Sequence, residues 1–186
     1  MTETEQEAEA NFALEFYVRR NIRYHLRRYA FFTKWSRFIA FVGVLFGSAA
    51  AATLIAGWPK WATAGLALVV TVAAAIDLIV GISQRGALHN DLRRDYLSIQ
   101  EDIACKGEPS ADDRKAYWAK IHRIESDEPP EKTVLELMSR NEVVCSLYDD
   151  EERSTHFVAI PWHMKITAHW INWDVTELRP SRPVNN

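Results

Sequence analysis

One acidic residue, Asp77, lies inside an otherwise apolar stretch, and it is the residue that most suggests chemistry in this chain. A carboxylate in an apolar span costs free energy, so such groups usually face a helix-bundle interior or water. On a helix, Asp77 shares one face with the small residues Ala73, Ala74 and Gly81. Two roles are open for this carboxylate. It lines or gates a pore, or it bonds a backbone amide, a hydroxyl group or Arg85.

Other kinds of chemical site have little support in the sequence. His156, His163 and His169 follow one another at seven and six residues, so no helical face joins them as a ligand pair. No nucleophile elbow, phosphate-binding glycine loop or zinc-protease motif is present. The two cysteines, Cys105 and Cys145, belong to no motif and are expected to be reduced structural residues. The sequence therefore predicts no enzyme activity, no cofactor and no metal.

Asp77 belongs to the second of two apolar runs that are long enough to cross a bilayer. Residues 38–57 hold no charge, and residues 62–82 hold Asp77 alone. Twenty helical residues span about 30 Å, which is the thickness of a bilayer core. The turn between the runs is Trp58-Pro59-Lys60-Trp61, and tryptophan favours the headgroup boundary. We therefore expect a two-helix transmembrane hairpin over residues 38–82.

Neither a signal peptide nor a soluble helical hairpin fits this pattern well. A cleaved signal begins near the N-terminus, whereas the first run here follows 37 residues that are rich in charge. A core helix of a soluble protein keeps one polar face, and both runs are apolar all round.

The distribution of basic residues around the apolar runs predicts how the hairpin is oriented in the membrane. The chain of 186 residues has 22 basic and 25 acidic residues, so its net charge of −3 gives no electrostatic case for nucleic acid. Lys60 is the one basic residue of the turn, while both outer flanks are basic. Basic flanks favour the cytoplasmic side. Both termini are therefore expected in the cytoplasm, with Arg37, Arg85, Trp58 and Trp61 at the membrane interfaces and the lipid bilayer as a partner.

The flanks of the hairpin are predicted to be helical. Residues 1–10 are expected to form a disordered acidic tail, residues 11–37 a cytoplasmic helix, residues 83–174 a cytoplasmic helical region, and residues 175–186 a second tail. The helix over 11–37 either lies on the anionic leaflet or, as we favour, packs and runs into the first span. The fold class is thus an all-α membrane protein whose transmembrane hairpin continues into a cytoplasmic helical bundle.

Within residues 83–174, several local signals are specific. An apolar stripe needs a partner, either the N-terminal helix or another subunit, as in a coiled coil; it consists of Leu88, Leu92, Tyr96, Ile99 and Ile103. Ser110 and Asp113 have the spacing of a helix cap. A further helix is expected over residues 133–147, closed by the acidic run 149–152. The alternation near residues 164–171 fits either a strand or a helix.

Gly43 and Gly47 are four residues apart in the first apolar run. Small residues at this spacing let membrane helices approach closely, either within the hairpin or between subunits. Two spans are too few to enclose a water path, so any conduction would require a homo-oligomer.

The layout resembles the SLATT family of bacterial two-transmembrane proteins over roughly residues 11–150. The segments that carry the resemblance are RGALHNDLRRDYLSIQEDIA after the hairpin and TVLELMSRNEVVCSLYD further on. The resemblance implies a pore-forming or membrane-perturbing effector of anti-phage defence in the bacterial inner membrane. It also implies a homo-oligomer and a partner sensor that makes or binds nucleotide signals.

Two alternatives remain open beside this resemblance. One is a membrane-anchored helical binding or scaffold module, and the other is a small ion channel subunit. The segment 154–174 has no counterpart in the family layout.

Overall fold

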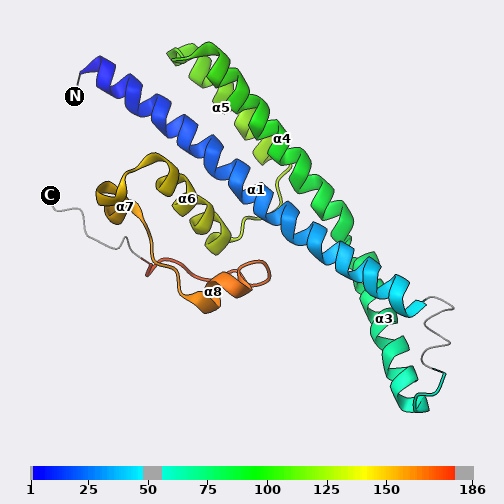
Figure 1. Ribbon diagram of the computed structural model, residues 1–186. Coiled ribbons are helices and arrows are strands. Elements are labelled where there is room, and N and C mark those ends of the chain that lie inside the picture. Colours follow the sequence, from blue (N-terminus) through cyan, green and yellow to red (C-terminus); the bar gives the residue numbers. More distant parts are fainter. Residues whose placement is uncertain (1, 48–55, 179–186) are drawn as a thin grey trace. The chain divides into compact units, whose positions relative to one another are not determined.

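The described residues of this computed structural model, 2–47 and 56–178, form helices joined by short connections (Figure 1). This confirms the all-helical fold class. The chain divides into two units, one formed by residues 1–27 with 90–186 and the other by residues 28–89. Two helices, α1 (Glu3–Gly47) and α4 (Ile82–Lys106), begin in one unit and end in the other.

The unit of residues 28–89 holds the apolar part of the chain. Its α3 helix (Lys60–Val80) has no buried residue along its 21 positions. Both α1 and α3 are long and apolar enough to cross a membrane. The predicted first span does not begin a separate helix, because α1 continues unbroken from the polar N-terminal region to Gly47. The rest of that span, residues 48–55, lies outside the described residues.

The second apolar helix ends earlier than the predicted boundary at Ile82. Gly81 adopts a left-handed backbone conformation with φ of +63°, and its N–H donates to the Asp77 carbonyl oxygen at 2.9 Å. Glycine is favoured at this position because it has no Cβ to clash. The chain therefore turns at Gly81, and the buried Ile82 begins α4.

The unit of residues 1–27 and 90–186 begins with a helix rather than the predicted acidic tail. The α1 helix starts at Glu3, and Glu3 and Glu5 occupy its first turn, where acidic side chains complement the helix dipole. Further along, Glu7 lies 3.8 Å from the guanidinium of Arg114. The acidic composition alone had indicated disorder, whereas these local interactions support a helix.

A hydrophobic cluster joins α1, α4 and α5 (Ala111–Glu125) in this unit. Leu14 and Val18 of α1 pack with Tyr96 and Ile99 of α4, and α5 adds Tyr117 and Ile121. Three members of the apolar stripe of α4, Tyr96, Ile99 and Ile103, therefore pack within their own chain against the N-terminal helix, which was one of the two expected partners, whereas Leu88 is exposed. This arrangement also shows that the N-terminal helix packs against protein along this part of its length.

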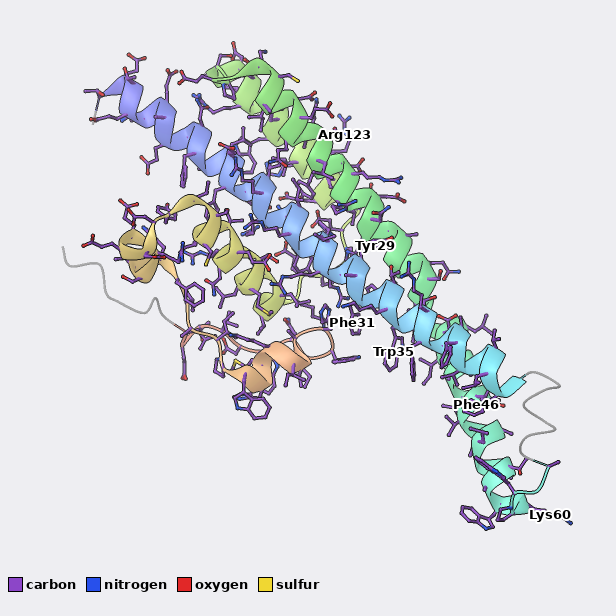
Figure 2. The ribbon with its side chains drawn as sticks, viewed as in Figure 1. Tyr29, Phe31, Trp35, Phe46, Lys60 and Arg123 are labelled. Carbon is purple, nitrogen blue, oxygen red and sulfur yellow. The ribbon has the colours of Figure 1, made fainter. Side chains whose placement is uncertain are left out.

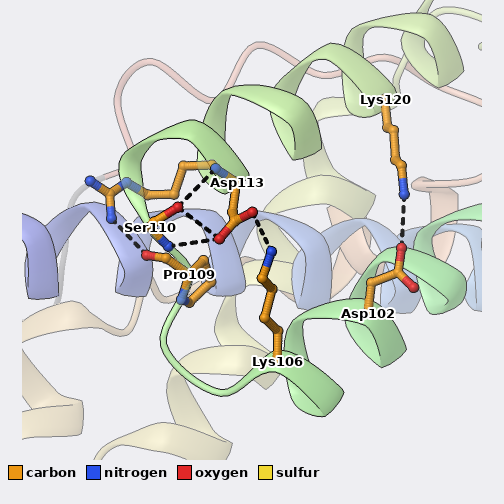
Figure 3. A network of polar contacts seen from close by, with 7 residues as sticks. Asp102, Lys106, Pro109, Ser110, Asp113 and Lys120 are labelled. Atoms are coloured by element: carbon orange, nitrogen blue, oxygen red, sulfur yellow. Dashed lines mark hydrogen bonds and ion pairs between the residues drawn. The ribbon is translucent and has the colours of Figure 1, made fainter.

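The α4–α5 connection is fixed by the predicted helix cap (Figure 3). The Ser110 hydroxyl accepts the Asp113 backbone N–H at 3.3 Å, and the Asp113 carboxylate accepts the Ser110 N–H at 3.1 Å. Lys106 also pairs with Asp113. The contacts with Lys106 and Ser110 hold the pKa of Asp113 at about 2. Nearby, Lys120 of α5 reaches Asp102 of α4 at 2.8 Å.

Three further helices follow: α6 (Thr133–Leu147), α7 (Asp150–His156) and α8 (Trp162–Thr167). The bounds of α6 agree with the prediction. The acidic run begins α7, because the Asp149 carboxylate accepts the backbone N–H groups of Glu151 and Glu152. Of the two structures expected near residues 164–171, the chain adopts a short helix that starts after Pro161.

The C-terminal segment packs against α6 by polar and apolar contacts. The Asn141 side chain donates to the Val158 carbonyl at 2.7 Å and accepts the Val158 N–H at 3.1 Å. Asn172 accepts the free N–H at the start of α6, from Thr133, at 3.1 Å. A second hydrophobic cluster lies beneath these contacts and includes Tyr24, Val134, Leu135, Ile160 and Ala168.

Candidate functional site

Asp77 keeps its isolated position in the structure. Its Oδ1 atom is buried, and within the described part of the chain it has no hydrogen-bond partner. The adjacent Leu78 and Ile79 are more than four-fifths exposed. Ala73, one turn earlier on the same face, is partly buried, whereas Ala74 is exposed. The carboxylate therefore lies on the one partly covered face of an otherwise exposed apolar helix.

The side chain of Arg85 contacts the backbone at the end of α3. Its Nε donates to the Val80 carbonyl oxygen at 2.9 Å, just past the turn at Gly81. A cation there satisfies a free carbonyl and complements the negative end of the helix dipole. The sequence had offered Asp77 as a partner of Arg85, whereas the guanidinium binds the Val80 carbonyl.

An apolar groove runs between α1 and α3 in the unit of residues 28–89. It has a volume of about 360 Å³ and is lined almost wholly by apolar surface from Trp35, Phe38, Ile39, Leu68, Val69, Val72, Ala73 and Ile76. Figure 2 labels Trp35 on α1. A groove of this composition suits an acyl chain or another apolar helix, since it offers no polar group to a soluble ligand.

The other residues predicted for the membrane are the two glycines of α1 and the residues expected at the interfaces. A Cβ added at Gly43 would meet no atom within 4 Å, so this glycine is not needed for close packing within the described chain. Gly47 is the last residue of α1. Trp58, Trp61 and Arg37 are exposed. The two tryptophans flank Pro59 at the start of α3, where the predicted headgroup boundary lies.

A buried polar cluster joins the helices of the other unit, and the sequence did not point to it. Glu128 accepts the Tyr96 hydroxyl at 2.8 Å, and its Oε1 lies 3.2 Å from the His25 Nε2. The rings of His25 and Tyr96 are stacked with centroids 5.6 Å apart. All three side chains are almost fully buried. Burial, and then the negative charge of Glu128, raise the pKa of Tyr96 far above its usual value.

A second polar group lies about two turns earlier on α1. The Tyr17 hydroxyl donates to Glu125, which also contacts His122 at 2.9 Å. Burial and this hydrogen bond raise the pKa of Tyr17 to about 12. Burial acts to raise the pKa of Glu125, but the bonds from Tyr17 and His122 outweigh it and leave that pKa lowered. Burial and the nearby Glu136 raise the pKa of Glu131.

Arginines of α1 hold α6 in this unit. Arg20 reaches Glu136 at 2.7 Å, Arg27 pairs with Glu142, and Arg23 donates to the Ser146 hydroxyl at 3.1 Å. These residues belong to the basic flank that predicts a cytoplasmic location. Because they contact α6, fewer basic groups of α1 remain for lipid headgroups than the sequence suggested.

An aromatic groove of about 320 Å³ lies between α1 and the α6–α7 region. Its lining combines rings with one cation and one acid: Glu9, Phe12, Phe16, Tyr17, Arg140, Tyr148 and His156 among others. Arg140 donates to the His156 carbonyl at 2.7 Å, and Tyr148 stacks on His156. In the ranges that the structure covers, no group of three or more His, Cys, Asp or Glu side chains could hold a metal ion.

Comparisons with known proteins do not identify a relative. No family model, no curated protein and no solved structure matches the chain. The features of the chain that bear on its function are therefore the two apolar helices, Asp77 and the contacts of the helical unit.

Proposed function

We propose that this chain is an integral membrane protein whose apolar helices insert as a hairpin, and that several copies form a membrane-permeabilising pore. The observation that carries the proposal is α3, a 21-residue apolar helix with no fully buried residue. A soluble protein would bury such a helix, because exposed apolar surface costs about 25 cal/mol per Å² in water. A bilayer removes that cost.

A pore is favoured over a simple anchor because of Asp77. An anchor needs no carboxylate within its span, and an unpaired carboxylate raises the cost of insertion. The Oδ1 atom of Asp77 lacks a hydrogen-bond partner in its own chain, as far as the structure describes it. Water in an oligomeric pore, or a group from a second copy, would satisfy this oxygen.

The biological setting of the proposal comes from the layout that resembles the SLATT family. On that basis the chain acts in the bacterial inner membrane, as an effector of anti-phage defence, with both termini in the cytoplasm. A separate sensor that makes or binds nucleotide signals would trigger it. The helical unit of residues 1–27 and 90–186 would receive that trigger.

The proposal is tested by following membrane potential with a dye while the chain is expressed in bacteria from a tightly controlled promoter. Depolarisation before growth arrest is expected for the native chain, and a weaker effect for Asp77→Asn at equal membrane abundance. Asp95→Asn is the matched control, since Asp95 is exposed on α4 outside the apolar helices. A steady potential despite confirmed insertion would contradict a pore that opens on expression alone and would favour the membrane-anchored binding module, unless the separate sensor is needed for opening.

The second candidate is a membrane-anchored binding module, and the aromatic groove between α1 and α6–α7 favours it. A groove of this size, with several rings and Arg140, is typical of a ligand or peptide site. Replacing residues 38–82 with an unrelated transmembrane hairpin distinguishes the two functions. Activity would survive this replacement in a binding module and would be lost in a pore.

A further inference from the structure

The short helix α8 displays a second apolar surface, far along the chain from the hairpin. Trp162 and Ile166 are 73 % and 62 % exposed, and they are the two large apolar side chains that α8 turns outward. Ile171, just after α8, is also exposed. We call Trp162, Ile166 and Ile171, together with Lys165, the α8 patch.

The α8 patch faces outward because the opposite face of α8 packs into the core of the unit. Met164 and Ala168 are one turn apart and pack into the second hydrophobic cluster of the unit. Trp162 and Ile166 are also one turn apart but are offset by two residues, which places them on the opposite side of the helix. The exposed face therefore follows from the fold of the unit and not from a loose terminus.

Several hydrogen bonds hold the segment around α8 to α6. Asn141 binds the Val158 backbone before α8, and Thr133 binds Asn172 and the Trp173 carbonyl after it. The Trp173 indole N–H donates to the Thr167 hydroxyl at 2.9 Å. A patch held in this way presents its apolar side chains at little further entropic cost.

We propose that the α8 patch docks on the headgroup region of an anionic bilayer as a second membrane contact of the same chain. This inference rests on the proposed insertion of the hairpin, which keeps a lipid surface near the unit. Exposed tryptophan and isoleucine beside lysine have the composition of interfacial segments.

The charge of the patch favours an anionic partner, and its exposed tryptophan favours a lipid interface over an acidic protein. Residues 157–173 contain Lys165 and no Asp or Glu. A second cation, Lys132, reaches the Trp170 carbonyl at 3.3 Å. The nearest acid in sequence, Asp174, accepts the Thr176 backbone N–H, an interaction that lowers its pKa. Glu177 follows three residues later.

The test places single fluorescent labels on the full chain in nanodiscs that contain anionic lipid. Cys105 and Cys145, both exposed, are first changed to serine. Labels are then attached at Ile166→Cys in the α8 patch, at Leu68→Cys on α3, and at Lys115→Cys on α5 as a solvent control. Spin-labelled lipids quench each label according to its depth in the bilayer.

We expect the Ile166 label to be quenched most by spin labels near the headgroup, and the Leu68 label by spin labels near the acyl-chain end. The Lys115 label should not be quenched. Trp162→Glu should reduce quenching of a label at Ile171→Cys at least several-fold, whereas Lys115→Glu should not. Trp162 is too exposed for this change to unfold the unit.

Two results would overturn the inference. If the Leu68 label is quenched and the Ile166 label is not, the hairpin inserts but α8 does not touch lipid. If the Ile166 label is shielded from solvent yet unquenched by lipid, a protein surface or a second copy covers the patch. Loss of quenching at both positions would instead contradict the membrane insertion itself.

Discussion

At the scale of single residues, Glu128 illustrates how a buried carboxylate is accommodated in this chain. It lies in the α5–α6 connection, yet it contacts Tyr96 of α4 and His25 of α1. A buried acid without such partners would be strongly destabilising, whereas here one carboxylate links three parts of the chain. Glu128 therefore fixes the connection against both helices.

Replacing Glu128 with alanine should destabilise the helical unit by about 1–3 kcal/mol, because the buried Tyr96 hydroxyl then loses its acceptor. Thermal unfolding in detergent measures this change through the helical circular dichroism signal. Glu101→Ala is the control, because Glu101 is exposed on α4. Equal losses in the two variants would show that the buried contacts contribute nothing specific.

The raised pKa of Tyr17 predicts how the stability of the folded chain changes at alkaline pH. Burial, and then its bond to Glu125, raise its pKa from 10.0 to about 12 in the folded chain. Below pH of about 10 the phenol is protonated in both states, so its contribution to stability is complete. As the pH rises towards about 12, the unfolded chain releases this proton and the folded chain retains it. The free energy of unfolding therefore falls.

Tyr17→Phe should consequently flatten the fall in stability across this alkaline window. Denaturation of the protein in detergent at a series of pH values measures the slope, with tyrosinate absorbance recorded in parallel. The pKa of Tyr96 is also raised, in the native chain and in the Tyr17→Phe variant alike. The variant should therefore keep part of the alkaline fall in stability. An unchanged slope would mean that Tyr17 titrates normally in the folded state.

At the scale of elements, the junction of α3 and α4 depends on one glycine. Gly81→Ala should cost about 1–2 kcal/mol, because φ of +63° is unfavourable for residues with a Cβ, and the added Cβ would also meet the Gln84 side chain. Gly65→Ala, in the middle of α3 with no atom within 4 Å of the added Cβ, should be neutral or slightly stabilising. Thermal unfolding of both variants checks this contrast. A destabilised Gly65→Ala with an unaffected Gly81→Ala would contradict it.

The elements also show what the sequence could predict. The bounds of α6 and the cap at Ser110 were accessible because local signals, prolines and a serine with a well-spaced acid, determine them. The packed face of α1 was not. It runs through Leu14, Val18, Asn21 and His25 at steps of four, three and four, and two of these buried residues are polar.

An apolar pattern cannot reveal a buried face that includes polar residues, such as His25, whose burial depends on a tertiary contact with Glu128. The same limit applies to the candidate site. Asp77 was conspicuous because it interrupts an apolar run, whereas the use of Arg85 at the end of α3 depends on the turn at Gly81. The contacts of the α1 arginines with α6 likewise join residues more than a hundred positions apart.

At the scale of the whole molecule, the proposed topology assigns each cysteine and each turn to one side of the membrane. Cys105 and Cys145 are exposed in the helical unit, which is proposed to be cytoplasmic. Lys60 begins α3 beside Trp58 and Trp61, at the turn proposed to face outward. Two helices that cross the bilayer must place these positions on opposite sides.

We therefore expect opposite labelling of the two regions in intact bacterial spheroplasts. A polyethylene-glycol maleimide, which is too large to pass a small-ion pore, should label Lys60→Cys in a Cys105→Ser, Cys145→Ser chain without permeabilisation. The native cysteines should react only after permeabilisation. The reverse pattern would invert the topology and place the basic flanks outside. Labelling of both regions from one side would exclude a hairpin that crosses the bilayer, because α1 and α3 would then lie on the surface.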